Sequence, residues 1–396
     1  MAFDVARVRG LYPTLGGGVT HLDGPFGALQ PESVIRAIIT TLRSAPIQPG
    51  SSSPHSIRTA ESVLAARQAV ADLVGGSAAN VLLGGNLSTL LTRFASLAAR
   101  DWQLGDEIVL NRLDRDLSLR PWLEAARPCG VVVRWAEADL ETGELPTWQY
   151  QKLINRRTRI VTVPLANPTT GTVPDVAAIS ALAHAVGALV VVDAAAAVPH
   201  LGIDIDGLGA DVVGVSAPTF GGPSVGALIA RQGLLSEIDD DEGPVPERYE
   251  LGSLPIELLD GLTAAIDHLA GLDESASGTR RERLLRSFAS VAVHEHRLLS
   301  RLESRLRALP GVTVLGAPAQ RVPVTAFTVL GNSPAKVGTH LAQHNISVWT
   351  GPSGTAQLMS VLGVDELGGA VHVGLMPHST RAEVDQLITA LSRIAG

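Results

Sequence analysis

The chain of 396 residues contains very little cysteine and few aromatic residues. Its single cysteine, Cys129, excludes an intramolecular disulfide and a zinc cluster built on cysteines, and we interpret it as a structural residue. Aromatic residues make up 4% of the chain, so aliphatic side chains must fill the core. No apolar run approaches the ~18–20 residues that a membrane span needs, so a membrane is not an expected partner.

Charge and lysine content narrow the function classes further. Residues 1–4 include an acid and lack a basic flank, so we expect no secretory signal and a cytoplasmic location. The net charge of -8 argues against nucleic acid as a main partner. Of the 31 lysine and arginine residues, only Lys152 and Lys336 are lysines, and both lie in stretches that we expect to form surface helices.

The remaining composition is that of a folded globular protein, with 45% hydrophobic and 18% charged residues. Its length exceeds that of one ordinary hydrophobic core, so we expect two domains. We predict a large domain over 16–270, and a small α+β domain formed by 1–15 together with 271–396.

Short β-branched runs alternate with helical patterns between about residues 80 and 230. This alternation is typical of a mostly parallel sheet with helices on both faces. The expected strands are 80–84, 107–113, 131–136, 159–164, 188–193, 211–216 and 226–231, with helices at 89–100, 118–127 and 175–186.

The second part of the chain begins with an acidic run, 239–244, that predicts a surface loop. Two helices, 255–270 and 280–309, should follow. The remaining residues predict an α+β domain with strands 312–315, 324–330, 346–350 and 370–375 and helices 334–344 and 381–394.

Residues suited to a ligand lie at the expected ends of strands, where open α/β sheets bind their ligands. Gly85 and Asn86 belong to a glycine-rich turn that suits a phosphate, although a plain turn capped by Ser88 fits equally well. The turn lacks the GxGxxG spacing, which counts against a dinucleotide-binding oxidoreductase. Asp193 directly follows an apolar run, and its carboxylate either holds a protonated ring nitrogen or caps a helix. Two further such segments are 216–223 and 250–253.

Taken in order, these segments resemble the class V aminotransferase and cysteine desulfurase family of fold type I pyridoxal-phosphate enzymes. Further matching landmarks are 22–25, 105–109, 121–122, 199–200, 209–211 and 373–374. The resemblance implies a large domain with a mostly parallel seven-stranded sheet, a smaller C-terminal α+β domain, and a homodimer.

The resemblance also implies a set of site residues. The positions that match cofactor-binding residues of the family are Gly85, Asn86, Arg115, Asn167, Asp193, Ala196, Ser216, Thr219 and Ser253, and His372 matches a substrate-binding position. The family's lysine, which forms the imine with the cofactor, matches Thr219. A threonine hydroxyl has no amine and is a poor base near neutral pH.

Other matched positions also differ from the family pattern. Pro218 replaces the histidine that helps to bind the phosphate, and Ala196 replaces the partner of the ring oxygen. Arg115 replaces the histidine that stacks on the ring, although a guanidinium can also lie flat on a π-face. His372 replaces the arginine that grips the substrate carboxylate.

Two further matches concern an amide and a hydroxyl. Asn167 falls one position before the family's cofactor-contacting asparagine, whose place Pro168 takes. Ser253 matches a residue that reaches the cofactor phosphate of the neighbouring subunit. Residues 349–354, which match the loop that carries the desulfurase cysteine, contain no cysteine.

These departures lead to a hypothesis with an alternative. The leading hypothesis is a pseudoenzyme that binds a small anionic ligand or a partner, with pyridoxal phosphate absent or bound only non-covalently. The alternative is an enzyme that uses non-covalently held pyridoxal or pyridoxamine phosphate, or another mechanism, in the same cleft, with His200 or His372 as the base. A more speculative hypothesis is a heterodimer with a lysine-bearing relative, to which this chain lends Ser253.

Overall fold

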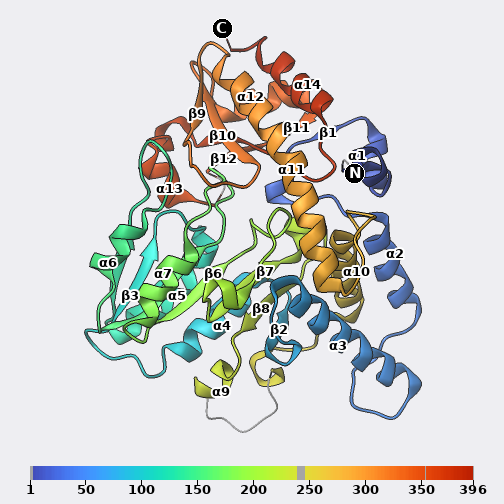
Figure 1. The fold of residues 1–396 in the computed structure, drawn as a ribbon, viewed down its shortest axis with the longest axis vertical. Helices are drawn as coiled ribbons and strands as arrows, with labels where there is room; N and C mark the ends of the chain where they lie inside the picture. Colours follow the sequence, from blue (N-terminus) through green and yellow to red (C-terminus); the bar gives the residue numbers. More distant parts are fainter. Residues whose placement is uncertain (1–2, 239–245, 353, 396) are drawn as a thin grey trace.

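The computed structural model describes residues 3–238, 246–352 and 354–395, so the acidic run predicted as a surface loop lies outside the described residues. The chain forms a large sheet with helices on both faces and a smaller sheet beside it (Figure 1). The long helix α11 (Arg280–Arg307) runs from the large part to the small one.

The large sheet has seven strands in the order β2-β8-β7-β6-β5-β3-β4. β8 is antiparallel to both of its neighbours, and the other pairs are parallel. All the strands predicted for this sheet are confirmed, with small differences at their ends. They are β2 (Val81–Gly84), β3 (Glu107–Asn111), β4 (Val132–Ala136), β5 (Thr158–Pro164), β6 (Leu189–Asp193), β7 (Val212–Ser216) and β8 (Gly226–Ala230).

Successive side chains of a strand point to opposite faces of the sheet, so the large part has two hydrophobic layers. In β6, Val190 and Val192 pack into one layer and Val191 into the other. The first layer lies under α3 (Pro54–Val74), α7 (Val176–His184) and α10 (Ile256–Ala270). The second lies under α4 (Leu87–Ala98) and α5 (Asp116–Cys129), where Cys129 is half-buried.

The first eighty residues contain helices that the sequence analysis did not assign. They are α1 (Val5–Gly10), α2 (Glu32–Arg43) and α3. Ser53 caps α3 by accepting a hydrogen bond from the Ser56 N–H, and Pro54 occupies the first helical position. Both α2 and α3 pack against α10, which explains why apolar stripes on these helices are buried.

The small part is a four-stranded antiparallel sheet in the order β12-β13-β10-β9. Its strands are β9 (Val312–Leu315), β10 (Val324–Val329), β12 (Trp349–Gly351) and β13 (Ala370–Gly374). The carboxyl half of α11 packs on one face together with α12 (Pro334–Ala342) and α14 (Arg381–Leu391). Met359 of α13 (Ala356–Val361) packs with residues of the other face.

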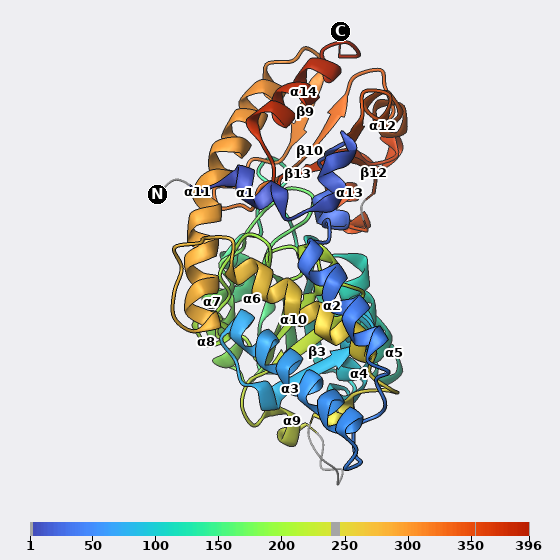
Figure 2. The ribbon, with the colours of Figure 1, turned by 90° about the vertical axis from the view of Figure 1, so that its right-hand side faces the viewer.

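The prediction of one strand over 346–350 was wrong. The structure has two strands there, because the chain moves from one sheet to another at Val348: β11 (Ile346–Ser347) pairs in parallel with β1 (Thr20–His21), whereas β12 pairs with β13. Leu22, directly after β1, is buried in the core of the small part. The expected large-domain range 16–270 therefore includes a strand that pairs with the small domain, and Figure 2 shows this N-terminal segment beside the C-terminal elements.

Candidate functional site

Most of the predicted site residues lie at the carboxyl ends of the parallel strands. We call this end of the large sheet its carboxyl edge. β2 runs in the same direction as β7, because both are antiparallel to β8. The turn with Gly85 and Asn86 after β2 therefore shares this edge with Asp193 and Ser216, the last residues of β6 and β7. This is the edge at which open α/β sheets bind ligands.

Thr219 lies in a short 3-10 turn, η5 (Ala217–Phe220), directly after β7. Its Oγ1 is 2.6 Å from the Ala195 carbonyl oxygen and 2.8 Å from the Ser216 carbonyl oxygen. A hydroxyl has one proton, so Thr219 donates it to the main chain. The residue is 9% exposed, and its polar atom serves to join the ends of β6 and β7.

Asp193 is bound by Arg115, which follows β3. Arg115 Nη2 lies 2.7 Å from Asp193 Oδ2, and Nε lies 3.3 Å from the same oxygen. The Ser118 hydroxyl donates to this oxygen as well, and the Ala195 N–H donates to Oδ1 at 2.8 Å. Burial by itself would raise the pKa of Asp193, but Arg115 and these hydrogen bonds hold that pKa below its usual range.

Asp114, the residue before Arg115, is a second buried carboxyl at this edge. Burial and the nearby charge of Asp193 raise the pKa of Asp114 to about 7. Its Oδ1 accepts a hydrogen bond from the Arg115 N–H at 2.9 Å. Arg115 thus contacts both carboxyl groups, through its backbone N–H with Asp114 and through its guanidinium with Asp193.

The Asn167 side chain is hydrogen-bonded within the chain through both its amide nitrogen and its oxygen. Its amide donates to the Leu113 carbonyl oxygen at 2.5 Å, and its Oδ1 accepts from the N–H groups of Thr169 and Thr170 at 2.8 and 2.9 Å. These bonds fix the turn after β5 and link it to the segment after β3. In this arrangement Asn167 supports the edge of the sheet.

The turn after β2 is an exposed helix start. Asn86 is the N-cap of α4, since its Oδ1 accepts from the Thr89 N–H at 2.8 Å, so the expectation that Ser88 caps this helix was wrong. Asn86 precedes Ser88 by two residues, and its side chain reaches the third N–H. A Cβ at Gly226 of β8 would lie 2.2 Å from the Leu87 nitrogen, so only glycine allows β8 to approach this turn so closely.

Ser253 lies on the outer side of β2, in a pocket of about 390 Å³ that Arg67 and Glu250 also line. Arg67 and Glu250 form a two-pronged ion pair at 2.7 and 2.9 Å, and Glu250 Oε1 accepts a hydrogen bond from the Leu83 N–H at 2.6 Å. Both charged side chains are almost fully buried. The pair fixes the segment that carries Ser253 to the edge strand, and Ser253 itself is exposed.

His372 is fully buried in β13 of the small sheet. Its Nε2 lies 2.9 Å from the Gly351 carbonyl oxygen, and its ring and that of Phe26 form a T-shaped contact at 5.5 Å between centroids. Phe26 in turn stacks on Trp349 at 4.9 Å. Burial lowers the pKa of His372 to about 4, so the imidazole is neutral and presents no positive charge to a carboxylate.

A loop of the small domain is fastened to the start of α5. The Asp116 N–H donates to the Gly354 carbonyl oxygen at 2.8 Å, and the Ala356 N–H donates to Asp116 Oδ2 at 3.2 Å. Arg112 also donates to Gln357. The segment 354–357 is thereby held against the residues that flank Arg115.

Comparison with known proteins agrees with this geometry. The family model described as Aminotransferase class-V matches residues 20–387. The chain belongs to the class V aminotransferase family. It is 43% identical over 401 residues to an uncharacterised protein of Mycobacterium tuberculosis, with 100% of both chains covered. It is 28% identical over 422 residues to a cysteine desulfurase of Yersinia pseudotuberculosis, covering 100% of this chain and 99% of the other.

The fold is also that of solved class V structures. A cysteine desulfurase from Thermococcus onnurineus superposes with a TM-score of 0.88 at 24% identity, covering 100% of this chain and 98% of the other. The predicted fold type I architecture is therefore confirmed. Members of the family use pyridoxal phosphate.

The sequence analysis did not single out two polar residues at this end of the sheet, Asp114 and Ser118. Asp114 lies between β3 and α5, and Ser118 lies in the first turn of α5, so both belong to the segment that leaves the carboxyl end of β3. In the part of the chain that the structure describes, no group of three or more histidine, cysteine or acidic residues could hold a metal ion. None of the described helices is long and apolar enough to cross a membrane.

Proposed function

We propose that this chain is a class V aminotransferase/cysteine desulfurase-like protein that forms no imine with pyridoxal phosphate and acts by binding a ligand or a partner. The observation that carries this proposal is the geometry of Thr219. We infer that Thr219 stands where the family has its lysine, and its hydroxyl already donates to the main chain. It supplies neither an amine for the imine nor a base for a proton transfer.

The ion pair between Arg115 and Asp193 supports the same conclusion. In the family an aspartate at this position holds the protonated ring nitrogen of the cofactor. Here its Oδ2 binds Arg115 at 2.7 Å, and Ala196, at the position of the ring-oxygen partner, has no polar side-chain atom. The residues at this edge do not fit a pyridoxal phosphate that is held through an imine.

Neither lysine of the chain is placed to substitute. Lys152 lies on α6 (Tyr150–Leu153) with its Nζ 5.0 Å from the ring centre of the exposed Trp148. This helix precedes the amino end of β5, whereas Thr219 follows the carboxyl end of β7, so the two lie at opposite ends of the strands. Lys336 is exposed in the first turn of α12 in the small domain.

The test is a titration of the purified protein with pyridoxal phosphate, followed by borohydride reduction and intact-mass measurement. We expect no imine absorbance and no site-specific mass gain in the natural chain. A variant with Lys152→Arg and Lys336→Arg leaves only the α-amino group and gives the background of non-specific labelling.

A gain-of-amine variant makes the test specific for position 219. Thr219→Lys places an amine at the site, and a reducible adduct at that residue would support the assignment of this position. A stoichiometric adduct at Lys152 or Lys336 in the natural chain would overturn the proposal. Turnover of an amino acid by the natural chain with added pyridoxal or pyridoxamine phosphate would favour the alternative of a non-covalently held cofactor.

A further inference from the structure

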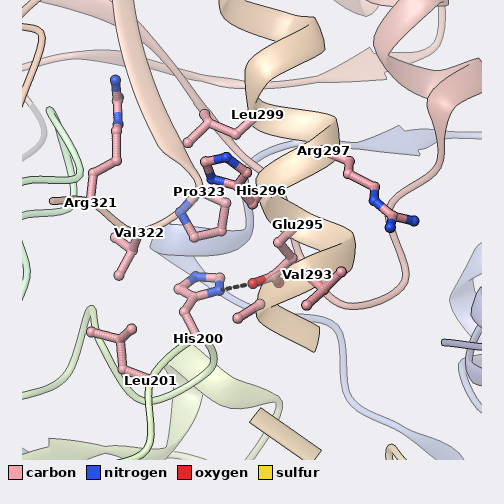
Figure 3. A pocket seen from close by; sticks show the side chains of 11 residues that line it. His200, Leu201, Val293, Glu295, His296, Arg297, Leu299, Arg321, Val322 and Pro323 are labelled. Atoms are coloured by element: carbon pink, nitrogen blue, oxygen red, sulfur yellow. Dashed lines mark hydrogen bonds and ion pairs between the residues drawn. The ribbon is translucent and has the colours of Figure 1, made fainter. Parts of the chain in front are cut away.

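A second pocket lies where α11 passes over the turn after β6 and the segment before β10 (Figure 3). Its volume is about 420 Å³, within the range of small-molecule sites. None of the residues that match cofactor-binding positions of the family lines it. A ligand in this pocket would therefore be held by a different set of side chains from those at the carboxyl edge.

A buried histidine and a buried glutamate form the enclosed polar part of this pocket. His200 Nδ1 lies 3.0 Å from Glu295 Oε2, and the two side chains are 3% and 2% exposed. Figure 3 shows the Glu295 carboxyl group directed from α11 toward His200. The other carboxyl oxygen, Glu295 Oε1, is buried and has no hydrogen-bond partner among the described residues.

Glu295 Oε1 is a hydrogen-bond acceptor whichever group of the pair holds the shared proton. With the proton on His200 Nδ1, Glu295 is an ionised carboxylate, and with the proton on Oε2, Oε1 is a carbonyl oxygen. A buried acceptor without a donor costs free energy. Burial also raises the pKa of Glu295, because the fold does not fully compensate its negative charge. A ligand that donates a hydrogen bond and carries a positive charge would relieve both penalties.

His200 adds a second acceptor to the pocket. The Glu295 carboxylate favours the tautomer whose proton lies on Nδ1, and Nε2 of that neutral ring has a lone pair. Figure 3 shows Nε2 on the side of Val322 and Pro323. Since the Nδ1 proton is already bound by Oε2, neither member of the pair presents a donor to the pocket. The pair is therefore suited to a ligand with N–H groups and not to an anion.

The two arginines that line the pocket do not pair with Glu295. The Arg321 guanidinium forms an ion pair with Glu303, which compensates its charge. Figure 3 shows the Arg297 guanidinium directed away from His200. The apolar walls suit an apolar ligand body, and they are formed by Leu201, Val293, Leu299, Val322 and Pro323.

We propose that this pocket binds a small primary amine with an apolar body. The ammonium group donates a hydrogen bond to Glu295 Oε1, and the apolar body lies against Leu201, Val322 and Pro323. Each oxygen of Glu295 then has a partner, His200 on Oε2 and the amine on Oε1. This inference does not depend on the absence of an imine at the carboxyl edge or on pyridoxal phosphate.

The test is isothermal titration calorimetry of the full chain with 3-methylbutylamine, with 3-methylbutan-1-ol and with the trimethylammonium derivative of the amine. The probes share one apolar body. The alcohol has a donor without a charge, and the trimethylammonium derivative has the charge without a donor. We expect the amine to bind at least about tenfold more tightly than either, because only the amine makes a charge-assisted hydrogen bond. Equal binding of the amine and its trimethylammonium derivative, or no binding of the amine at millimolar concentration, would overturn the proposal.

Three variants locate the site. Val293 is 55% exposed at the pocket, so Val293→Trp should fold and should abolish binding of the amine by filling the space. Ser304→Trp, at an exposed position further along α11, is the matched control and should bind as the natural chain does. Glu295→Gln keeps the size of the side chain but removes its charge, and should weaken binding of the amine about tenfold. Binding that survives Val293→Trp, or that is unchanged in a folded Glu295→Gln, would place the amine elsewhere and refute the assignment.

Discussion

Arg115 and Asp193, which are far apart in the sequence, form an ion pair at the carboxyl end of β6, with Nη2 2.7 Å from Oδ2. The Asp193 side chain is nearly buried, whereas about a quarter of the Arg115 side chain is exposed. The guanidinium thereby compensates the charge of a buried carboxylate at this end of the sheet.

Breaking this pair should destabilise the protein. Arg115→Met leaves the buried Asp193 carboxylate without its cation, and we expect a loss of about 2–3 kcal/mol in the free energy of unfolding. This range allows for solvent screening of the partly exposed arginine. Urea unfolding at neutral pH measures the loss.

The double variant Arg115→Met with Asp193→Asn is the control for this prediction. It removes both charges together, so it should recover at least about 1 kcal/mol relative to Arg115→Met alone. Strictly additive losses from the two substitutions would mean that the pair has no net coupling.

Acid should destabilise the fold through buried histidines. His268 accepts a hydrogen bond from the Tyr12 hydroxyl at 2.7 Å, and burial together with Arg7 lowers the pKa of His268 to about 4. The unfolded chain has an ordinary histidine pKa near 6.5, so below that pH the unfolded state binds a proton that the folded state does not. The contribution of His268 is therefore present at neutral pH and is lost as the pH falls toward 4.

His268→Gln isolates this effect, because glutamine still accepts from Tyr12 but does not titrate. Between about pH 7 and pH 4.5, the stability of the natural chain should fall by about 2 kcal/mol relative to the variant. The exposed His55→Gln serves as the control and should leave the pH profile unchanged. Parallel profiles for the natural chain and His268→Gln would refute the prediction.

The loop at 354–357 should loosen when Asp116 is altered. Asp116→Ala removes the acceptor of the Ala356 N–H, and a lost hydrogen bond of this kind is worth about 1 kcal/mol. We expect amide hydrogen exchange at Ala356 to rise about fivefold, with little change in exchange across the large sheet. Glu124→Ala, which breaks an exposed pair with Arg120 on the same helix, should not have this effect. Unchanged exchange at Ala356 in Asp116→Ala would show that other contacts hold the loop.

We expect a homodimer whose interface includes the surface around Ser253. Leu64 and Leu251 are 65% and 69% exposed, and Leu64 lines the same pocket as Ser253. Leu64→Asp should convert a dimer to a monomer in light scattering at micromolar concentration, because a charge would be buried in an apolar contact. Leu330→Asp in the small domain, at an even more exposed position, should remain dimeric. A natural chain that is monomeric in this measurement would contradict the expectation.

Local patterns in the sequence were sufficient to predict most of the secondary structure. Runs such as 188–193 are apolar on both faces, and burial on both faces is what a central strand requires, so the seven-stranded sheet could be predicted. The edge that gathers Asp193, Ser216 and Thr219 followed from the same pattern, because residues that directly follow parallel strands share one end of the sheet.

The two strands within 346–351 show what local sequence patterns do not determine. A single extended run fits either one strand or two, and only pairing of Ile346 with Thr20 and of Trp349 with His372 decides between them. Such pairings join residues that are distant in the chain, and no local period encodes them.

The sequence by itself determined which chemical groups this protein has: one cysteine, two lysines, and a threonine directly after β7. The tertiary structure decided which partner each group has. Arg115 binds Asp193, Thr219 donates to Ala195, and His200 lies against Glu295. The two residues of each pair are distant in the sequence, and only folding brings them together. The reason is that composition and periodicity fix burial and backbone conformation, whereas the state of a buried polar group depends on the particular atoms that the fold places within hydrogen-bond distance.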